Sequence, residues 1–194
     1  MTTTYDPKIT ALLCIDFYND FLSEGGKLWP WVRDMAKEVN LLDNLRTIVR
    51  TAREAGIKIY HVPHHRWEPG DYVNWKYPSP YQLGAGERQA FAKGTWGGTF
   101  QDDFQVQEGD IVVTEHWASS GFPTTDLEHQ LKRYGKERSS AWACSPTPAL
   151  RRRRASEWNS ASTSRSCATP QRPGRRKPIT PPSILTAQPM RMRS

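Results

Sequence analysis

TALLCIDFYNDF, residues 10–21, is the stretch from which the fold of this chain can be read. Its first half, Ala11 to Ile15, is an unbroken apolar run of strand length. Such a run, without polar alternation, is typical of a strand buried on both faces of a parallel sheet. The run ends on Asp16, and open α/β sheets place their chemistry at the carboxyl ends of central strands. Asp16 is therefore either a catalytic carboxylate or a cap for the following turn.

Helix and strand patterns alternate after this first strand. Apolar residues recur at spacings of three and four from Asp34 to Ala55, which predicts one amphipathic helix with Asp34 as its N-cap and Gly56 as its stop. The order of strand, helix and strand predicts a parallel βαβ unit. The further predicted elements are strands at Ile57–Val62 and Ile111–Thr114, and a helix at Asp126–Tyr134 with Leu127, Leu131 and Tyr134 on one face and Gly135 as its stop.

The segment from Glu68 to Phe104 is long, aromatic and rich in Gly and Pro, and reads as a loop. Long ordered loops in compact domains are usually functional or form interfaces. Its aromatic side chains therefore predict either a lid over a substrate or a contact between subunits.

LLCIDFYNDF and the later GDIVVTEHWASSGFPTTDL together resemble the isochorismatase-like cysteine hydrolases, the superfamily that includes nicotinamidases. The resemblance runs from about Thr10 to about Arg138. It implies an α/β fold: a three-layer α/β/α domain on a parallel, Rossmann-like sheet. It also implies that Asp16 is the general base of an Asp–Lys–Cys triad, which hydrolyses a small-molecule amide C–N bond or, less often, a vinyl ether.

The lysine of that triad is missing from this chain. Alignment on the third strand places Glu115 at its position, and His116 is the alternative because the loop is one residue longer. The family lysine stabilises the charges of the thiolate and the carboxylate. A glutamate beside Asp16 would act in the opposite way, because two close carboxylates raise each other's pKa. Either His116 supplies the cation or this branch works differently.

The resemblance also implies a substrate pocket near the ends of the first and third strands. A pair of adjacent histidines, His64 and His65, leaves the second strand at the same edge, and either holds the following loop or ligates a metal, as in some relatives. Zinc ligands on one element are usually spaced more widely, which favours the first interpretation. We expect no cofactor. The predicted substrate contacts are Phe21, Trp96, Trp117, Ser120 and Phe122.

Composition predicts a cytoplasmic protein. The N-terminus lacks the basic and apolar regions of a signal peptide, and no apolar run reaches membrane-spanning length. The three cysteines, Cys14, Cys144 and Cys167, have no metal-ligand spacing. The expected partner is a small-molecule substrate, with no membrane, and full-length relatives are expected to form homo-oligomers.

The net charge of +7 divides unevenly along the chain. Residues 139–194 contain ten Arg, one Lys and one Glu, a formal charge of +10, so residues 1–138 carry −3. The tail is rich in Pro, Ser and Arg without apolar periodicity, a composition that predicts disorder. Nucleic-acid binding by the tail is disfavoured, because it lacks interleaved aromatics and the preceding domain is acidic. A non-catalytic ligand-binding relative is a further alternative.

A shifted reading frame explains this tail better than a basic binding segment. We read each codon's last base with the first two bases of the next codon. Because Trp has a single codon, the Trp142–Ala143 junction must then encode Gly and the Trp158–Asn159 junction Glu. The other junctions permit a strand, a turn containing Cys at the Pro148–Ala149 junction, and a helix. That order is the one the family has at this point.

The sequence therefore divides into an incomplete hydrolase domain at residues 1–138 and an out-of-frame tail at residues 139–194. The nucleophilic Cys of the family is absent, because Cys144 lies in WACSPTP rather than in the family turn. Cys14 is expected in the core with its side chain away from the site. We expect the chain as written to be catalytically defective.

Overall fold

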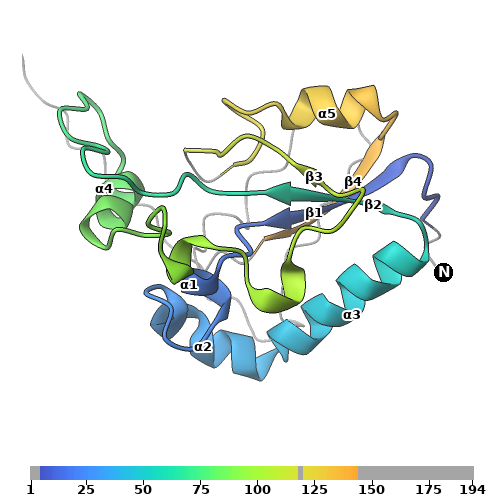
Figure 1. The fold of residues 1–194 in the computed structure, drawn as a ribbon, viewed down its shortest axis with the longest axis horizontal. Helices are drawn as coiled ribbons and strands as arrows, with labels where there is room; N and C mark the ends of the chain where they lie inside the picture. The colour runs from blue at the N-terminus through green and yellow to red at the C-terminus, as the bar shows by residue number, and fades with distance from the viewer. Residues whose placement is uncertain (1–4, 118–119, 144–194) are drawn as a thin grey trace, which may run out of the picture.

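The computed structural model describes residues 5–117 and 120–143. Four parallel strands pair in the order β3-β2-β1-β4. Helices cover both faces of this sheet, with α2 and α3 on one side and α5 on the other (Figure 1), so the three-layer α/β/α prediction is confirmed. The strands are β1 Thr10–Ile15, β2 Lys58–Val62, β3 Ile111–Val112 and β4 Arg138–Ala143.

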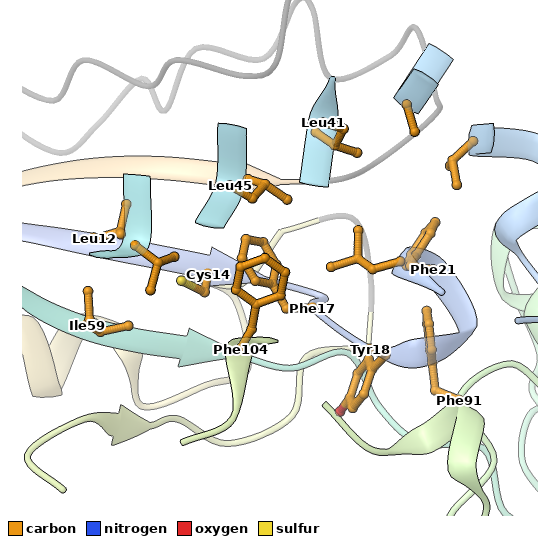
Figure 2. Packing of buried hydrophobic residues seen from close by; sticks show 14 of the residues in the cluster. Leu12, Cys14, Phe17, Tyr18, Phe21, Leu41, Leu45, Ile59, Phe91 and Phe104 are labelled. Atoms are coloured by element: carbon orange, nitrogen blue, oxygen red, sulfur yellow. The ribbon is translucent and has the colours of Figure 1, made fainter. Parts of the chain in front are cut away.

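Side chains from the two faces of β1 pack in two separate hydrophobic cores. Leu12 and Cys14 lie in a cluster with Ile59 of β2 and with Leu41 and Leu45 of α3, as Figure 2 shows. The alternate residues face the opposite way and pack with α5 in a second cluster. This arrangement confirms that β1 is buried on both faces, and it explains why the strand has no polar alternation. The second cluster consists of Ala11, Leu13, Tyr60, Val62, Val113, Leu127 and Leu131.

The predicted helix over residues 34–55 is two helices, α2 Trp29–Glu38 and α3 Leu41–Glu54. The break lies at Asn40, whose φ of 52° is left-handed and cannot continue a helix. Asp34 is inside α2 and not an N-cap. The predicted stop is confirmed, since Gly56 has a φ of 71° just beyond α3.

The segment between residues 68 and 104 was predicted to be a loop, but it contains short helices. These are α4 Pro80–Glu87 and the 3₁₀ turns η1 Trp96–Gly98 and η2 Asp102–Phe104. A capping box begins α4: the Ser79 side chain accepts from the backbone of Gln82, whose side chain accepts from the backbone of Ser79. In Figure 1, α4 lies beyond the carboxyl end of β2, away from the two layers of helices.

Two further helices complete the fold, α1 Asn19–Leu22 and α5 Leu127–Arg133. Leu127 and Leu131 are buried as predicted, whereas Tyr134 is 41% exposed. Tyr134 lies just after α5, and the Lys58 ammonium nitrogen lies over its ring, 4.9 Å from the ring centroid. Within the described residues, no helix has the length and apolar content needed to span a membrane.

Strand β4 extends past the predicted domain boundary at residue 138. Ser139 pairs with Ala11 and Ser140 with Leu12 in a parallel ladder. Backbone N–H and C=O groups make this ladder, so serines can pair with the open edge of β1 where an apolar strand was expected. The prediction of an unpacked tail is therefore wrong for residues 139–143. Its remainder, 144–194, lies outside the described residues, as do Cys144 and Cys167.

Candidate active site

Asp16 leaves the carboxyl end of β1 in an unusual backbone conformation. Its φ is 60°, a left-handed value that costs a residue with a Cβ about 1 kcal/mol or more. Backbone hydrogen bonds hold it there: its N–H donates to Val62 O at 3.2 Å, and its carbonyl accepts from Tyr18 N at 2.8 Å. Its side chain is almost buried. Strained backbone of this kind clusters at functional sites, where surrounding contacts enforce it.

The side chain of Asp16 is paired with the imidazole of His116. Its Nε2 lies 2.9 Å from Asp16 Oδ1, and its side chain is buried. The His116 backbone is fixed against the end of β2, because its N–H donates to Pro63 O at 3.0 Å and its carbonyl accepts from His65 N at 2.8 Å. This ladder brings the ends of β1, β2 and β3 together. The pair is a buried carboxylate–imidazole unit that can hold and exchange one proton.

Glu115 turns away from this pair towards a separate cation. Its Oε1 accepts from Arg66 Nε at 2.6 Å and its Oε2 from Arg66 N at 3.0 Å, while His65 Nδ1 lies 3.2 Å from Oε2. Burial raises the pKa of Glu115, but the hydrogen bonds from His65 and Arg66 outweigh it and lower the pKa to about 2. The rise in pKa expected for a glutamate beside Asp16 does not arise, because the Glu115 carboxylate is paired with Arg66 instead. Of the two residues at the family lysine position, His116 is the one that contacts Asp16.

The two adjacent histidines have different surroundings. His65 holds the following loop, since its Nε2 lies 2.7 Å from Asp71 Oδ2. His64 is buried, and its ring meets that of His116 edge-on at a centroid distance of 5.0 Å. Across residues 5–117 and 120–143, no group of three or more potential metal ligands comes together. The loop-holding interpretation thus describes His65, whereas His64 belongs to the Asp16 site.

Aromatic side chains from the long segment cover this edge of the sheet. Trp117 stacks on His65 with centroids 3.5 Å apart, and Trp75 packs on Trp117 at 5.4 Å. Helix α4 approaches from the same side: Gln82 Nε2 donates to Trp117 O at 3.0 Å, and Tyr81 packs edge-on against His64 at 5.7 Å. Part of the aromatic segment therefore lies over the site, as a lid would.

The predicted substrate contacts do not gather in one place. Trp117 lies at the site, while Trp96 is 52% exposed on η1. Phe21 is buried in the core that faces α3, next to Phe91 (Figure 2). Phe122 packs against the opposite core, and Ser120 is exposed near it. Phe21 and Phe122 thus have packing roles, and substrate contact by Phe21, Trp96, Ser120 and Phe122 stays a prediction.

The Asn-Asp pair of the opening stretch is structural. Asp20 Oδ2 accepts from Phe91 N at 2.7 Å and its Oδ1 from Lys27 N at 3.0 Å. Asn19 Nδ2 donates to Trp96 O at 3.1 Å and to Thr99 Oγ1 at 3.0 Å. These contacts tie the segment at residues 91–99 to the end of β1. They keep the covering loop in place without contacting Asp16 themselves.

His64 and Tyr81 are site residues that the sequence analysis did not single out as substrate contacts. The only sequence signal for His64 was its position at the carboxyl end of the second strand, and Tyr81 had none beyond its place in the aromatic segment. Cys14 is confirmed as a core residue, because it lies in the cluster facing α3 (Figure 2). Burial, together with the charge of Asp110, raises the pKa of its thiol to about 12, so it is not a nucleophile.

A surface cavity of about 530 Å³ lies along α3, and none of the residues around Asp16 lines it. Its charged side chains pair with each other: Arg46 Nε lies 2.7 Å from Asp103 Oδ2, and Arg46 Nη1 lies 2.6 Å from Asp43 Oδ1. The cavity is therefore separate from the Asp16 site.

Curated relatives are similar in sequence to about two thirds of this chain. The ureidoacrylate amidohydrolase RutB of Pantoea ananatis is 30% identical over 142 residues, which cover 68% of this chain and 56% of the relative. RutB of Rhizobium rhizogenes is 30% identical over 144 residues, covering 68% and 57%. This chain thus spans little more than half the length of these relatives.

Solved structures share the fold. A cysteine hydrolase from Pseudomonas syringae pv. phaseolicola superposes with a TM-score of 0.56 at 20% identity, covering 71% of this chain and 60% of that one. An isochorismatase family protein from Desulfovibrio vulgaris gives a TM-score of 0.50 at 20% identity, covering 69% and 66%. The family model for the isochorismatase domain matches residues 10–138, most of the described structure. The chain belongs to the isochorismatase family of hydrolases.

Proposed function

We propose that this chain carries the acid–base part of a cysteine-hydrolase site that cleaves the C–N bond of a small-molecule amide. The observation that supports the proposal most is the 2.9 Å contact between Asp16 Oδ1 and His116 Nε2. Asp16 follows β1 at the position of the family's general base, and the relatives named as ureidoacrylate amidohydrolases cleave an amide. A carbamoyl-type amide is therefore the substrate class that we favour.

In the proposed reaction, Asp16 removes the proton from a cysteine thiol, and the thiolate attacks the carbonyl carbon. The C–N bond then breaks, and the departing amine takes the proton that Asp16 had accepted. Water next attacks the thioester, losing its proton to Asp16, and the C–S bond breaks to release the acid and the thiol. Donors in the cysteine turn would stabilise the oxyanion.

His116 takes the place of the family lysine in this proposal. A proton on Nε2 donates to Asp16 Oδ1, which orients the carboxylate and partly neutralises its charge. The buried position of both groups strengthens this interaction, because solvent screening is weak there. Glu115 does not share this role, since Arg66 and His65 hold its carboxylate.

The sequence as written offers no cysteine in the family's turn, so we expect almost no turnover from it. Restoring the reading frame after residue 138 would supply the cysteine. Loss of a nucleophile usually reduces kcat by several orders of magnitude. We therefore expect the chain to keep the Asp16–His116 site and to lack the hydrolytic activity.

The experiment compares this chain with a version whose frame is restored from codon 139. Ammonia release is measured with N-carbamoyl amino acids, ureidoacrylate and simple primary amides. We expect turnover from the restored chain alone, and inhibition of it by thiol alkylation. Equal turnover by the chain as written, lost on Cys144→Ala, would refute the assignment of the missing nucleophile. No C–N cleavage by either chain would refute the proposed function.

A further inference from the structure

Among the residues that the structure describes, one ring nitrogen of His64 has no hydrogen-bond partner, although the side chain is buried. Its Nδ1 lies 2.8 Å from the carbonyl oxygen of His65. A carbonyl oxygen can only accept, so Nδ1 carries a proton. Burial lowers the pKa of the ring, which keeps it neutral near pH 7. The other nitrogen, Nε2, is therefore an acceptor, and within residues 5–117 and 120–143 no donor lies within hydrogen-bond distance of this buried atom.

An unpaired acceptor of this kind is costly. Leaving a buried polar group unsatisfied destabilises the fold, and nearly all such groups in native proteins have a partner. The backbone holds the residue firmly in place: Tyr18 Oη donates to the His64 carbonyl at 2.9 Å, and the His64 backbone bridges to that of His116. The ring therefore has little freedom to find another partner.

The unpaired nitrogen belongs to the same site as the carboxylate–imidazole pair. The ring of His64 lies 5.0 Å from that of His116, whose Nε2 contacts Asp16. The charge of Asp16 also acts on the pKa of His64, which places the two groups in one electrostatic environment. A small molecule held against Asp16 would come within reach of His64.

We propose that His64 is a specificity-determining residue, whose Nε2 accepts an N–H from the substrate and so selects amides and ureido compounds over esters. This inference rests on the proposed function and adds a substrate class to it. Asp16 and Nε2 are both acceptors, so the site presents two acceptors to a ligand rich in N–H donors. A site built to accept a hydrogen bond discriminates against the analogue that lacks the donor.

Tyr81 controls access to this acceptor. Its ring packs edge-on against His64 at 5.7 Å. Although 37% of the residue is exposed, desolvation of its hydroxyl and the charge of Asp16 both raise the pKa of that hydroxyl. Tyr81 lies on α4, a helix in which no residue is buried. A ligand therefore reaches Nε2 by displacing one side chain of a lightly packed helix, and the core stays intact.

The test measures binding, so it does not depend on turnover. Succinamate and monomethyl succinate are titrated into the full chain; the two differ in having NH₂ or OCH₃ on one carbonyl. The wild-type chain should bind the amide about fivefold more tightly, since one hydrogen bond contributes about 1 kcal/mol and 1.4 kcal/mol is tenfold. The amide alone should shift the ¹⁵N resonance of His64 Nε2, with exposed His129 on α5 as an unchanged reference.

Two variants make the assignment specific. His64→Phe keeps an aromatic ring but removes the acceptor, and the preference should fall to about onefold. His64→Gln retains an acceptor atom near the position of Nε2, and part of the preference should return. If His64→Phe fails to fold, the Gln variant and the wild-type ¹⁵N shift still decide.

A preference retained in His64→Phe, an unchanged Nε2 resonance, or no saturable binding of succinamate would each overturn the proposal. These results are distinct from failure of the proposed function. Without C–N cleavage by the restored chain, a His64-dependent preference would still establish the binding role. Conversely, cleavage with no such preference would refute the role of His64 alone.

Discussion

At the scale of single residues, the site depends on which carboxylates are paired and with what. Asp16 faces His116 at 2.9 Å, and Glu115 faces Arg66 at 2.6 Å, although Glu115 and His116 are neighbours in sequence. Adjacent residues on an extended segment point to opposite sides. This alternation places His116 in the site and Glu115 in a network with Arg66, His65 and Asp71, which we call the loop network.

Glu115→Gln tests the loop network through the pH dependence of stability. The folded-state pKa of Glu115 is lowered from 4.5 to about 2, so its ionised form stabilises the fold above pH 4.5, and this contribution disappears as pH falls towards 2. At pH 7 we expect Glu115→Gln to lower the free energy of unfolding by about 1.5–3 kcal/mol, the range for hydrogen bonds to charged groups. Urea denaturation at pH 7 and pH 3 measures the difference.

Glu128→Gln on α5 is the matched control for this measurement. Glu128 pairs with Lys132 at 2.6 Å on an exposed helix face, and surface pairs of this kind contribute about 0.5 kcal/mol or less. Its effect should be small at both pH values. A Glu115→Gln effect that is no larger, or that grows as pH falls, would show that the network does not stabilise the loop.

At this scale, the sequence patterns correctly placed Asp16 at the end of β1, but they could not place the aromatic side chains near it. Asp16 followed from the strand end, and His116 was one of two alternatives for the missing lysine. Phe21 and Phe122 were expected at the substrate but pack in the two cores. An aromatic residue beside a signature motif can face either way, and only tertiary packing decides. His64 was noted only as a loop-holding or metal-ligating residue, because its position in the Asp16 site depends on tertiary packing.

At the scale of elements, two predictions failed because backbone conformation and helix capping do not follow the apolar pattern: the single helix over residues 34–55 and the loop at α4. The apolar spacing from residue 34 to residue 55 continues across Asn40, yet its left-handed backbone divides α2 from α3. Asn tolerates this conformation better than most residues, so the break is compatible with an amphipathic pattern on both sides. Helix α4 was missed for another reason: Gly84 and Gly86 lower helix propensity, and the capping box at Ser79 offsets that.

Two glycines in the covering segment should respond to alanine in opposite ways. A Cβ on Gly97 of η1 would lie 2.3 Å from Asp20 Oδ1, the carboxylate that anchors the segment. Gly97→Ala should therefore lower the free energy of unfolding by about 1–3 kcal/mol. A Cβ on Gly84 of α4 meets only the flexible Arg88 side chain, so Gly84→Ala should raise it by up to about 1 kcal/mol.

Thermal and urea unfolding of the two variants beside wild type provide the comparison. Hydrogen exchange should also slow in α4 of Gly84→Ala and quicken near residues 91–99 in Gly97→Ala. If Gly97→Ala were as stable as wild type, Asp20 would not be the anchor of the segment that covers the site.

At the scale of the whole molecule, the described fold covers the first part of an isochorismatase-type domain and then departs from it. The family match ends at residue 138, while β4 continues to Ala143 beside β1. The residues of β4, such as Ser139 and Ser140, were not expected to form a strand, yet they pair with β1. Backbone pairing at an open sheet edge is insensitive to side-chain type, which is why composition misled the prediction there.

The shifted reading frame makes a prediction about the gene. The DNA behind residues 139–194, read one base earlier, should be an open frame that encodes a strand, a turn with Cys at the Pro148–Ala149 junction, and an amphipathic helix. Nucleotide sequencing decides the matter directly. An early stop codon in that frame, or a codon other than Cys at that junction, would end the hypothesis.

The most direct test of the Asp16–His116 site is the effect of three substitutions on kcat/KM for a carbamoyl amide in the frame-restored chain. Asp16→Asn and His116→Ala should each reduce kcat/KM by about a hundredfold or more, since positioned acid–base groups contribute about 10²–10⁴ in rate. Glu115→Gln, which alters only the loop network, should change it less than tenfold. A loss with Glu115→Gln as large as that with Asp16→Asn, or full activity without His116, would contradict the account.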